Sequence, residues 1–253
     1  MNDWAVASIL FVCVFVGALL GIFLRFILPE RYFSEESKDV VRLGTGLVAT
    51  MAALVLGLLV ASAKSTFDVQ KGGMDQLSAN LILLDNTLSQ YGPEAQESRE
   101  TLRRMVSDAL KRIWPKEESD VSTFAPATMA SGRTFYTMIQ ELTPADDKQR
   151  GLKSIAVQVA VDLARTRWLL VAQEKSDAIP TPFLVVLVFW LAALFVSFGL
   201  FAPPNPAVIA TLMVCALSVS GAIFLILELA DPFEGLIQVS SAPLRSAFAL
   251  LGR

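Results

Sequence analysis

The chain has 253 residues, of which 54% are hydrophobic, and its mean hydropathy is +0.54. These values are typical of a membrane protein and exceed those of an ordinary soluble domain. The net charge of −3 and the lack of a basic tail give no basis for binding nucleic acid, so we predict no such partner. Because the chain has no histidine, it lacks the commonest general base and metal ligand, and we predict that it is no enzyme and holds no metal or cofactor.

Four runs of the sequence carry no ionisable side chain and are each about as long as a bilayer is thick. They are Trp4–Leu24, Leu43–Ala63, Phe183–Phe201 and Ala207–Leu227. The pattern predicts an all-α, polytopic membrane protein with four transmembrane helices. The first run contains the GxxxG step from Gly17 to Gly21, which we expect to lie close against the second helix.

The second run, Leu43–Ala63, has a small side chain at every fourth position. The residues are Thr45, Ala49, Ala53, Gly57 and Ala61. Four residues advance about 400° around a helix, so this row drifts slowly as a wrapped stripe. Small side chains let helices approach closely in lipid. Two interpretations stay open, because the stripe could serve helix packing or line a path through the membrane.

Residues 66–178 are polar and charged, and we predict that they form a helical extramembrane domain inserted between the second and third transmembrane helices. A helix beginning near Phe67 has apolar residues at heptad spacing from Leu77 to Tyr91, and Gly92-Pro93 ends it. Further helices are expected at about 94–114, at 133–142, and from a cap at Thr143 to about 178.

The last segment, residues 230–253, is expected to be an amphipathic tail after the second pair of membrane helices, residues 179–229. Three carboxylates stand three residues apart where the fourth helix ends: Glu228, Asp231 and Glu234. Such oxygens could bind a cation, although solvated end charges explain the same pattern.

Basic residues are slightly more numerous near the membrane on the side of residues 64–178 than in the short loop 25–42. By the positive-inside rule, we expect this domain and both termini to be cytoplasmic, in a bacterial inner membrane.

Several short motifs occur in an order that resembles the bestrophin-like family of bacterial membrane proteins. They are LDNTL (84–88), YGPE (91–94), IP (179–180), LELADPFEG (227–235) and APLR (242–245). The resemblance covers nearly the whole chain. The family is known mainly as a domain of unknown function and is named for its similarity to bestrophins, which are pentameric anion channels.

The resemblance implies that Leu43–Ala63 is the pore helix of a homo-oligomer. It also implies that Asp231–Glu234 stands where bestrophins have their calcium clasp. Bestrophin pores have an aromatic neck, whereas Leu43–Ala63 contains no aromatic residue. The clasp is also richer in acids than this tail, so gating by calcium is not implied.

Two functions follow from these patterns. The first is an oligomeric anion channel in which the second transmembrane helix lines the pore. The alternative is a non-conducting membrane scaffold or sensor, whose cytoplasmic helical domain binds a protein partner through the stripe from Met74 to Tyr91. In both cases the lipid bilayer surrounds the apolar helices.

Overall fold

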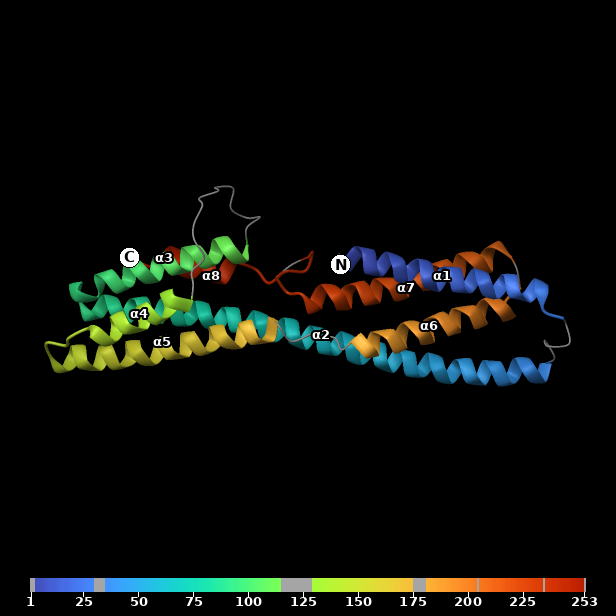
Figure 1. Cartoon of the computed structure of the whole chain (residues 1–253), viewed down its shortest axis with the longest axis horizontal. Helices are drawn as coiled ribbons and strands as arrows, with labels where there is room; N and C mark the ends of the chain where they lie inside the picture. The colour runs from blue at the N-terminus through green and yellow to red at the C-terminus, as the bar shows by residue number, and fades with distance from the viewer. Residues whose placement is uncertain are drawn as a thin grey trace. The chain divides into compact units, whose positions relative to one another are not determined.

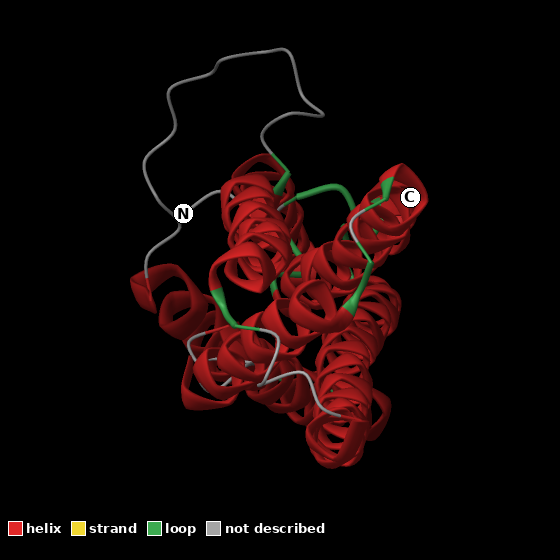
Figure 2. Ribbon diagram, turned by 90° about the vertical axis from the view of Figure 1, so that its right-hand side faces the viewer, coloured by secondary structure: helices red, strands yellow, loops and turns green. Residues whose placement is uncertain are grey.

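The computed structural model describes residues 3–29, 35–114, 129–174, 181–203, 205–233 and 235–252. In these ranges every regular element is a helix (Figures 1 and 2). The helices are α1 (Asp3–Ile27), α2 (Glu35–Tyr91), the short 3₁₀ helix η2 (Pro93–Ala95), α3 (Gln96–Ile113), α4 (Met129–Glu141), α5 (Asp147–Glu174), α6 (Thr181–Phe201), α7 (Pro206–Ala230) and α8 (Ala242–Leu250). The predicted all-α fold is confirmed, and α1, α2, α6 and α7 are long and apolar enough to cross a membrane.

The chain divides into two compact units. Unit 1 contains Met1–Phe67 and Asp177–Ile237, and unit 2 contains Asp68–Ser176 and Gln238–Arg253. Helix α2 contributes its first part to unit 1 and its second part to unit 2. The membrane segment and the heptad-patterned segment of the sequence are therefore parts of one helix, because the intervening residues include no proline to interrupt it.

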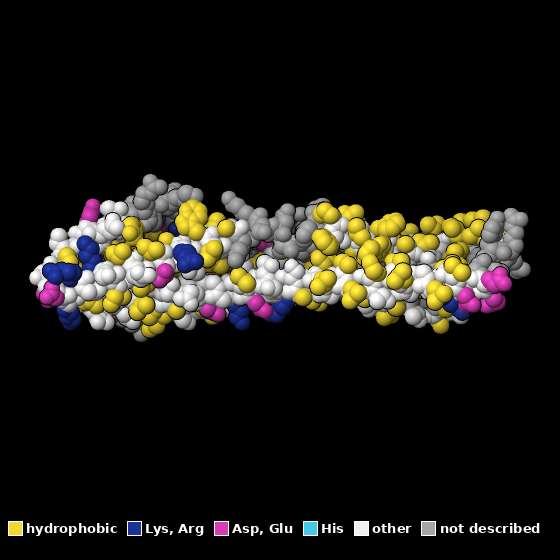
Figure 3. All heavy atoms as spheres, turned by 90° about the horizontal axis from the view of Figure 1, so that it is seen from below, with side chains coloured by type: hydrophobic (Ala, Val, Ile, Leu, Met, Phe, Trp, Pro, Cys, Tyr) yellow, Lys and Arg dark blue, Asp and Glu magenta, His cyan; other side chains and the backbone are white. Residues whose placement is uncertain are grey.

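Unit 1 has an apolar core formed by α1, α2, α6 and α7. The buried residues of α1 recur every fourth position: Leu10, Val14, Ala18 and Ile22. Helix α2 adds three buried residues to this core, Ala52, Leu59 and Ala63, and partly buried side chains of the same helix pack beside them. Most other large apolar side chains of unit 1 are exposed, and Figure 3 shows them covering much of this unit's surface. Such a surface suits lipid, in which apolar side chains need no protein cover.

Helices α1 and α6 cross at backbone contact around Gly21 and Gly199. A Cβ atom added to Gly21 would collide with the carbonyl oxygen of Val196, and one added to Gly199 would collide with that of Ala18. The prediction that the GxxxG step lies against the second transmembrane helix is therefore wrong. The step packs on α6, because α6 supplies a glycine of its own and close approach needs small residues on both helices.

Unit 2 is a helical bundle whose core includes the heptad stripe of α2. The buried stripe residues are Met74, Leu81, Leu84, Leu88 and Tyr91. Helix α3 adds the buried residues Leu102, Val106 and Leu110, and α4 and α5 also contribute buried side chains. The stripe is thus internal, as heptad spacing within a bundle requires.

Gly92 ends α2 as predicted, with a φ of 126° that disfavours any residue bearing a Cβ. The predicted helix start at Thr143 is wrong by a few residues, because α5 begins at Asp147. The cap is Asp146, whose Oδ1 accepts a hydrogen bond of 2.6 Å from the backbone N–H of Gln149. Gln149 Oε1 in turn accepts one of 2.7 Å from Ala145 N–H. This reciprocal pair satisfies two backbone donors, which explains why the helix starts here.

Candidate functional site

Helix α2 is the least covered of the four apolar helices. In the apolar 18-residue stretch of α2, only 17% of the residues are buried, whereas 28% are buried in the corresponding stretch of each of the other three helices. Of the small-residue stripe, Thr45 and Ala49 are half-buried, whereas Ala53, Gly57 and Ala61 are exposed. The stripe therefore begins beside the core of unit 1 and turns outward along the helix, as its slow drift requires.

The outward face of α2 leaves room for close contact. A Cβ atom added to Gly44, Gly46 or Gly57 would meet nothing within 4 Å. Two hydroxyl groups on this helix are satisfied locally, since Thr45 donates to Val41 O at 2.8 Å and Thr50 donates to Gly46 O at 2.9 Å. Such bonds to the preceding turn let threonine lie on an apolar helix without an unpaired donor. This face can therefore meet lipid, another subunit or a pore.

The carboxylate of Glu228 binds the loop that follows α7. Glu228 is only 1% exposed, and its Oε2 accepts hydrogen bonds from the backbone N–H groups of Leu236 at 2.5 Å and Ile237 at 3.2 Å. Gly235 permits this arrangement, because its φ is 84° and a Cβ atom there would collide with the carboxylate. The loop backbone thus holds this side chain in place.

The other two carboxylates of the predicted cation site, Asp231 and Glu234, are not seen beside Glu228 in the described residues. Asp231 is exposed at the end of α7, and Glu234 falls outside the residues that the structure describes. Within the described ranges, no group of three or more His, Cys, Asp or Glu side chains could hold a metal ion. The cation site stays a prediction.

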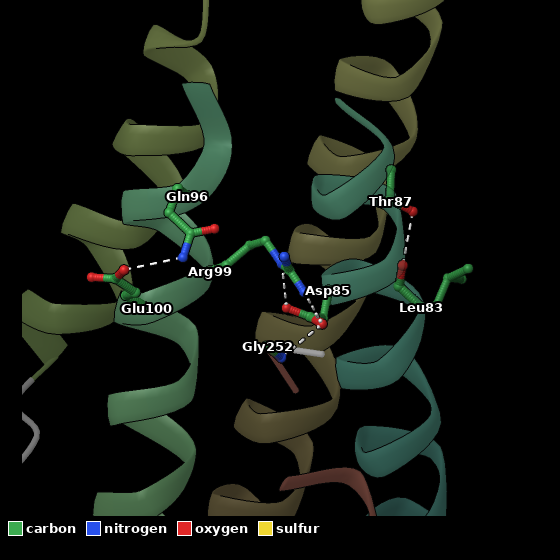
Figure 4. Close-up of polar contacts among 7 residues, drawn as sticks. All are labelled: Leu83, Asp85, Thr87, Gln96, Arg99, Glu100 and Gly252. Atoms are coloured by element: carbon green, nitrogen blue, oxygen red, sulfur yellow. Dashed lines mark hydrogen bonds and ion pairs between the residues drawn. The ribbon is translucent and has the colours of Figure 1, made fainter. Parts of the chain in front are cut away.

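A buried ion pair joins α2 to α3 within unit 2 (Figure 4). Arg99 donates through Nε to Asp85 Oδ1 at 2.9 Å and through Nη2 to Asp85 Oδ2 at 3.0 Å. The backbone N–H of Gly252 also donates to Asp85 Oδ2, at 3.2 Å. Asp85 is only 3% exposed, and its hydrogen bond raises the pKa of Arg99 above the ordinary value. Two helices and the C-terminal segment therefore meet at one carboxylate.

The sequence predictions did not include this pair, although the sequence contains a signal for it. Asp85 lies four residues after Leu81 and three before Leu88, so it shares the buried arc of α2 with the heptad stripe. A carboxylate on such an arc needs a charged or hydrogen-bonding partner. The spacing alone does not identify Arg99 as that partner.

The C-terminal tail packs on the helices of unit 2. Trp114 Nε1 donates to Val239 O at 3.1 Å, and the guanidinium of Arg103 lies 5.4 Å from the centre of the Phe248 ring. Leu244, Ala247 and Leu251 are buried. The amphipathic pattern of the tail is thus explained by packing on protein.

A sequence model of the bestrophin-like domain matches residues 12–244. The chain belongs to the bestrophin-like family. Crystal structures of a bacterial bestrophin homologue from Klebsiella pneumoniae, each carrying one substitution, have the same fold. One gives a TM-score of 0.66 at 14% identity and covers 96% of this chain and 98% of that one. A second gives 0.63, also at 14% identity, covering 94% and 97%.

No curated protein sequence matches this bestrophin-like chain. The family model and the shared fold confirm the resemblance inferred from the motifs.

Proposed function

We propose that this bestrophin-like chain is the subunit of a homo-oligomeric anion channel whose pore is lined by α2. The observation that carries the proposal is the sparse cover of α2, the least buried of the four apolar helices. Four helices of one chain enclose too little space for a hydrated path. Several copies arranged in a ring could surround one with the outward faces of their α2 helices.

The outward side of α2 has two neighbouring faces of different character. Gly46, Thr50, Ala53 and Gly57 lie within about 60° of one another at 100° per residue, and all four are exposed. Leu47, Leu54 and Leu58 are exposed on the adjoining face. We assign the small face to the pore, where narrow side chains leave room for water and ions. The leucine face suits lipid or the next subunit.

Substituting Gly57 with leucine is expected to narrow the pore and to lower single-channel conductance roughly tenfold, because a bulky apolar ring favours dewetting. Gly221→Leu on α7 is the matched control, since a Cβ atom at Gly221 also meets nothing within 4 Å. The control should conduct like the unchanged protein. Currents would be measured in planar bilayers with a chloride gradient. Equal conductance for both variants would contradict the pore face, and silent bilayers from an oligomeric preparation would contradict conduction.

We propose further that the protein lies in the bacterial inner membrane with residues 68–176 and both termini in the cytoplasm. Six basic residues support this side: Lys64, Lys71, Arg165, Arg167, Lys175 and Arg245. Four, in the loop after the first membrane helix, oppose it: Arg25, Arg31, Lys38 and Arg42.

A reporter that is active only in the cytoplasm, fused after Arg253, is therefore expected to be active. A periplasmic reporter at the same position should be silent, and comparable expression of the two fusions is the control. The reverse pattern would invert the orientation.

The alternative of a scaffold that binds a partner through the stripe from Met74 to Tyr91 loses its motivating observation. Those stripe residues are buried inside unit 2, so they offer no surface to a partner.

A further inference from the structure

Helix α5 has an exposed face that is apolar and basic. Val161, Trp168 and Leu169 are each about half exposed, and the exposed Arg165 stands between Val161 and Trp168. At 100° per residue, these four side chains fall within about 100° of one another around the helix. Large apolar side chains gathered in this way on a polar helical bundle are typical of a protein interface.

Helix α2 has a matching exposed face that is apolar and acidic. Val69 and Leu83 are about half exposed, and the exposed Asp75 stands between them along the chain. Gly72 lies near the middle of this face, and a Cβ atom there would meet nothing within 4 Å. The face therefore offers an open gap beside an apolar side chain and a carboxylate.

Contacts within unit 2 define which residues of the two helices lie at the same level. A Cβ atom at Gly73 would lie 2.6 Å from Leu170 Cδ2, and Gln149 Nε2 donates to Tyr91 O at 3.0 Å. Helix α5 therefore runs antiparallel to α2. At the helical rise of about 1.5 Å per residue, Arg165 lies close to the level of Asp75. Trp168 and Leu169 lie near Gly72, and Val161 lies near Leu83.

The two charged residues point away from the contact between α2 and α5, since Asp75 lies about 160° from Gly73 around α2. Leu170 contacts α2 and lies about 140° from Arg165 around α5, so the face of Arg165 is turned outward. Neither Arg165 nor Asp75 forms an ion pair within the described part of the chain. Two different outward faces are what a head-to-tail ring requires, because each copy then uses one face toward each neighbour.

We propose that α5 of one copy packs against α2 of the next copy, with Arg165 paired to Asp75 and Trp168 seated over Gly72. Rotation about a ring axis along these helices keeps every residue at its own level. On α5 the basic Arg165 lies between apolar residues, and on α2 the acidic Asp75 lies between apolar residues. The opposite charges favour this register over others. The inference rests on the homo-oligomer of the proposed function and does not depend on conduction.

The test is a charge exchange in the full chain, with oligomer mass measured by native mass spectrometry in detergent. Arg165→Asp and Asp75→Arg should each lower the oligomer fraction roughly tenfold, because like charges then face each other. The double variant should restore it. Gly72→Leu should also weaken assembly by filling the gap under Trp168. Lys148→Glu, an exposed charge change elsewhere on α5, is the control and should have no effect.

Each other outcome overturns a defined part. Oligomers that tolerate both single variants and Gly72→Leu would overturn this interface and leave the proposed function standing. Failure of the double variant to reassemble would overturn the Arg165–Asp75 pair. A monomeric unchanged protein would overturn the proposed function together with the interface.

Discussion

Substitution of Gly21 with alanine is expected to destabilise unit 1 by about 3 kcal/mol, the upper part of the range for overpacking a core. The added Cβ would collide with the carbonyl oxygen of Val196 and lie 2.8 Å from the backbone nitrogen of Leu200. Both atoms belong to the backbone of α6, so no side-chain rotation can relieve the clash. Helices α1 and α6 must separate, and the apolar contacts along both of them are then lost.

Gly17→Ala is the matched control for this prediction. Gly17 belongs to the same GxxxG step, but its added Cβ would lie 3.4 Å from Val196 Cγ2 and 3.6 Å from Ala192 O, which are ordinary contacts. Thermal unfolding of the purified chain in detergent, followed by circular dichroism, should show Gly17→Ala close to the unchanged protein and Gly21→Ala far below it. Equal stability of the two variants would contradict the backbone crossing of α1 and α6.

Removal of Arg99 is expected to destabilise unit 2 by about 3–5 kcal/mol, the usual cost of breaking a buried ion pair. Arg99→Leu leaves the carboxylate of Asp85, whose side chain is 5% exposed, without its two charged hydrogen bonds. Gly252 N–H alone then remains bound to it. Arg99→Lys keeps the charge but not the two-pronged geometry, so it should fall between the unchanged protein and Arg99→Leu.

Arg104→Leu is the control for the ion pair, because Arg104 lies on the exposed side of the same helix. Its effect should stay within about 0.5 kcal/mol, as is usual for exposed positions. Denaturant unfolding followed by tryptophan fluorescence would report the change, since Trp114 is buried in unit 2. If Arg99→Leu and Arg104→Leu unfold at the same denaturant concentration, the Asp85–Arg99 pair does not stabilise the bundle.

The glycine crossing of α1 and α6 has a consequence for α2. Because α1 packs closely on α6 and also on α7, much of the core of unit 1 comes from these three helices. Helix α2 adds three buried residues, Ala52, Leu59 and Ala63, together with partly buried neighbours. Much of the remaining circumference of this apolar part of α2 is exposed, and the proposed pore and subunit contacts lie there.

Local patterns in the sequence were sufficient for the class of fold and for the faces of the helices. Uncharged runs of bilayer length predict the four apolar helices. A charged side chain in the hydrocarbon core of a bilayer costs free energy, whatever the tertiary structure around it. Heptad spacing places Leu81, Leu84 and Leu88 inside a bundle. The positive φ of Gly92 follows from its place between a helix and a proline. Each of these results depends on neighbours within a few residues.

Only the tertiary structure decided which faces meet. The small residues Gly17 and Gly21 indicate that another backbone comes close, but the contact residue Val196 of α6 lies 175 residues after Gly21 in the sequence. The same holds for Asp85 and Gly252, which are 167 residues apart, and for the side of α2 that stays uncovered. Periodicity defines the direction of a side chain around its own helix. Its partner is selected by long-range packing, in which many segments compete for the same face.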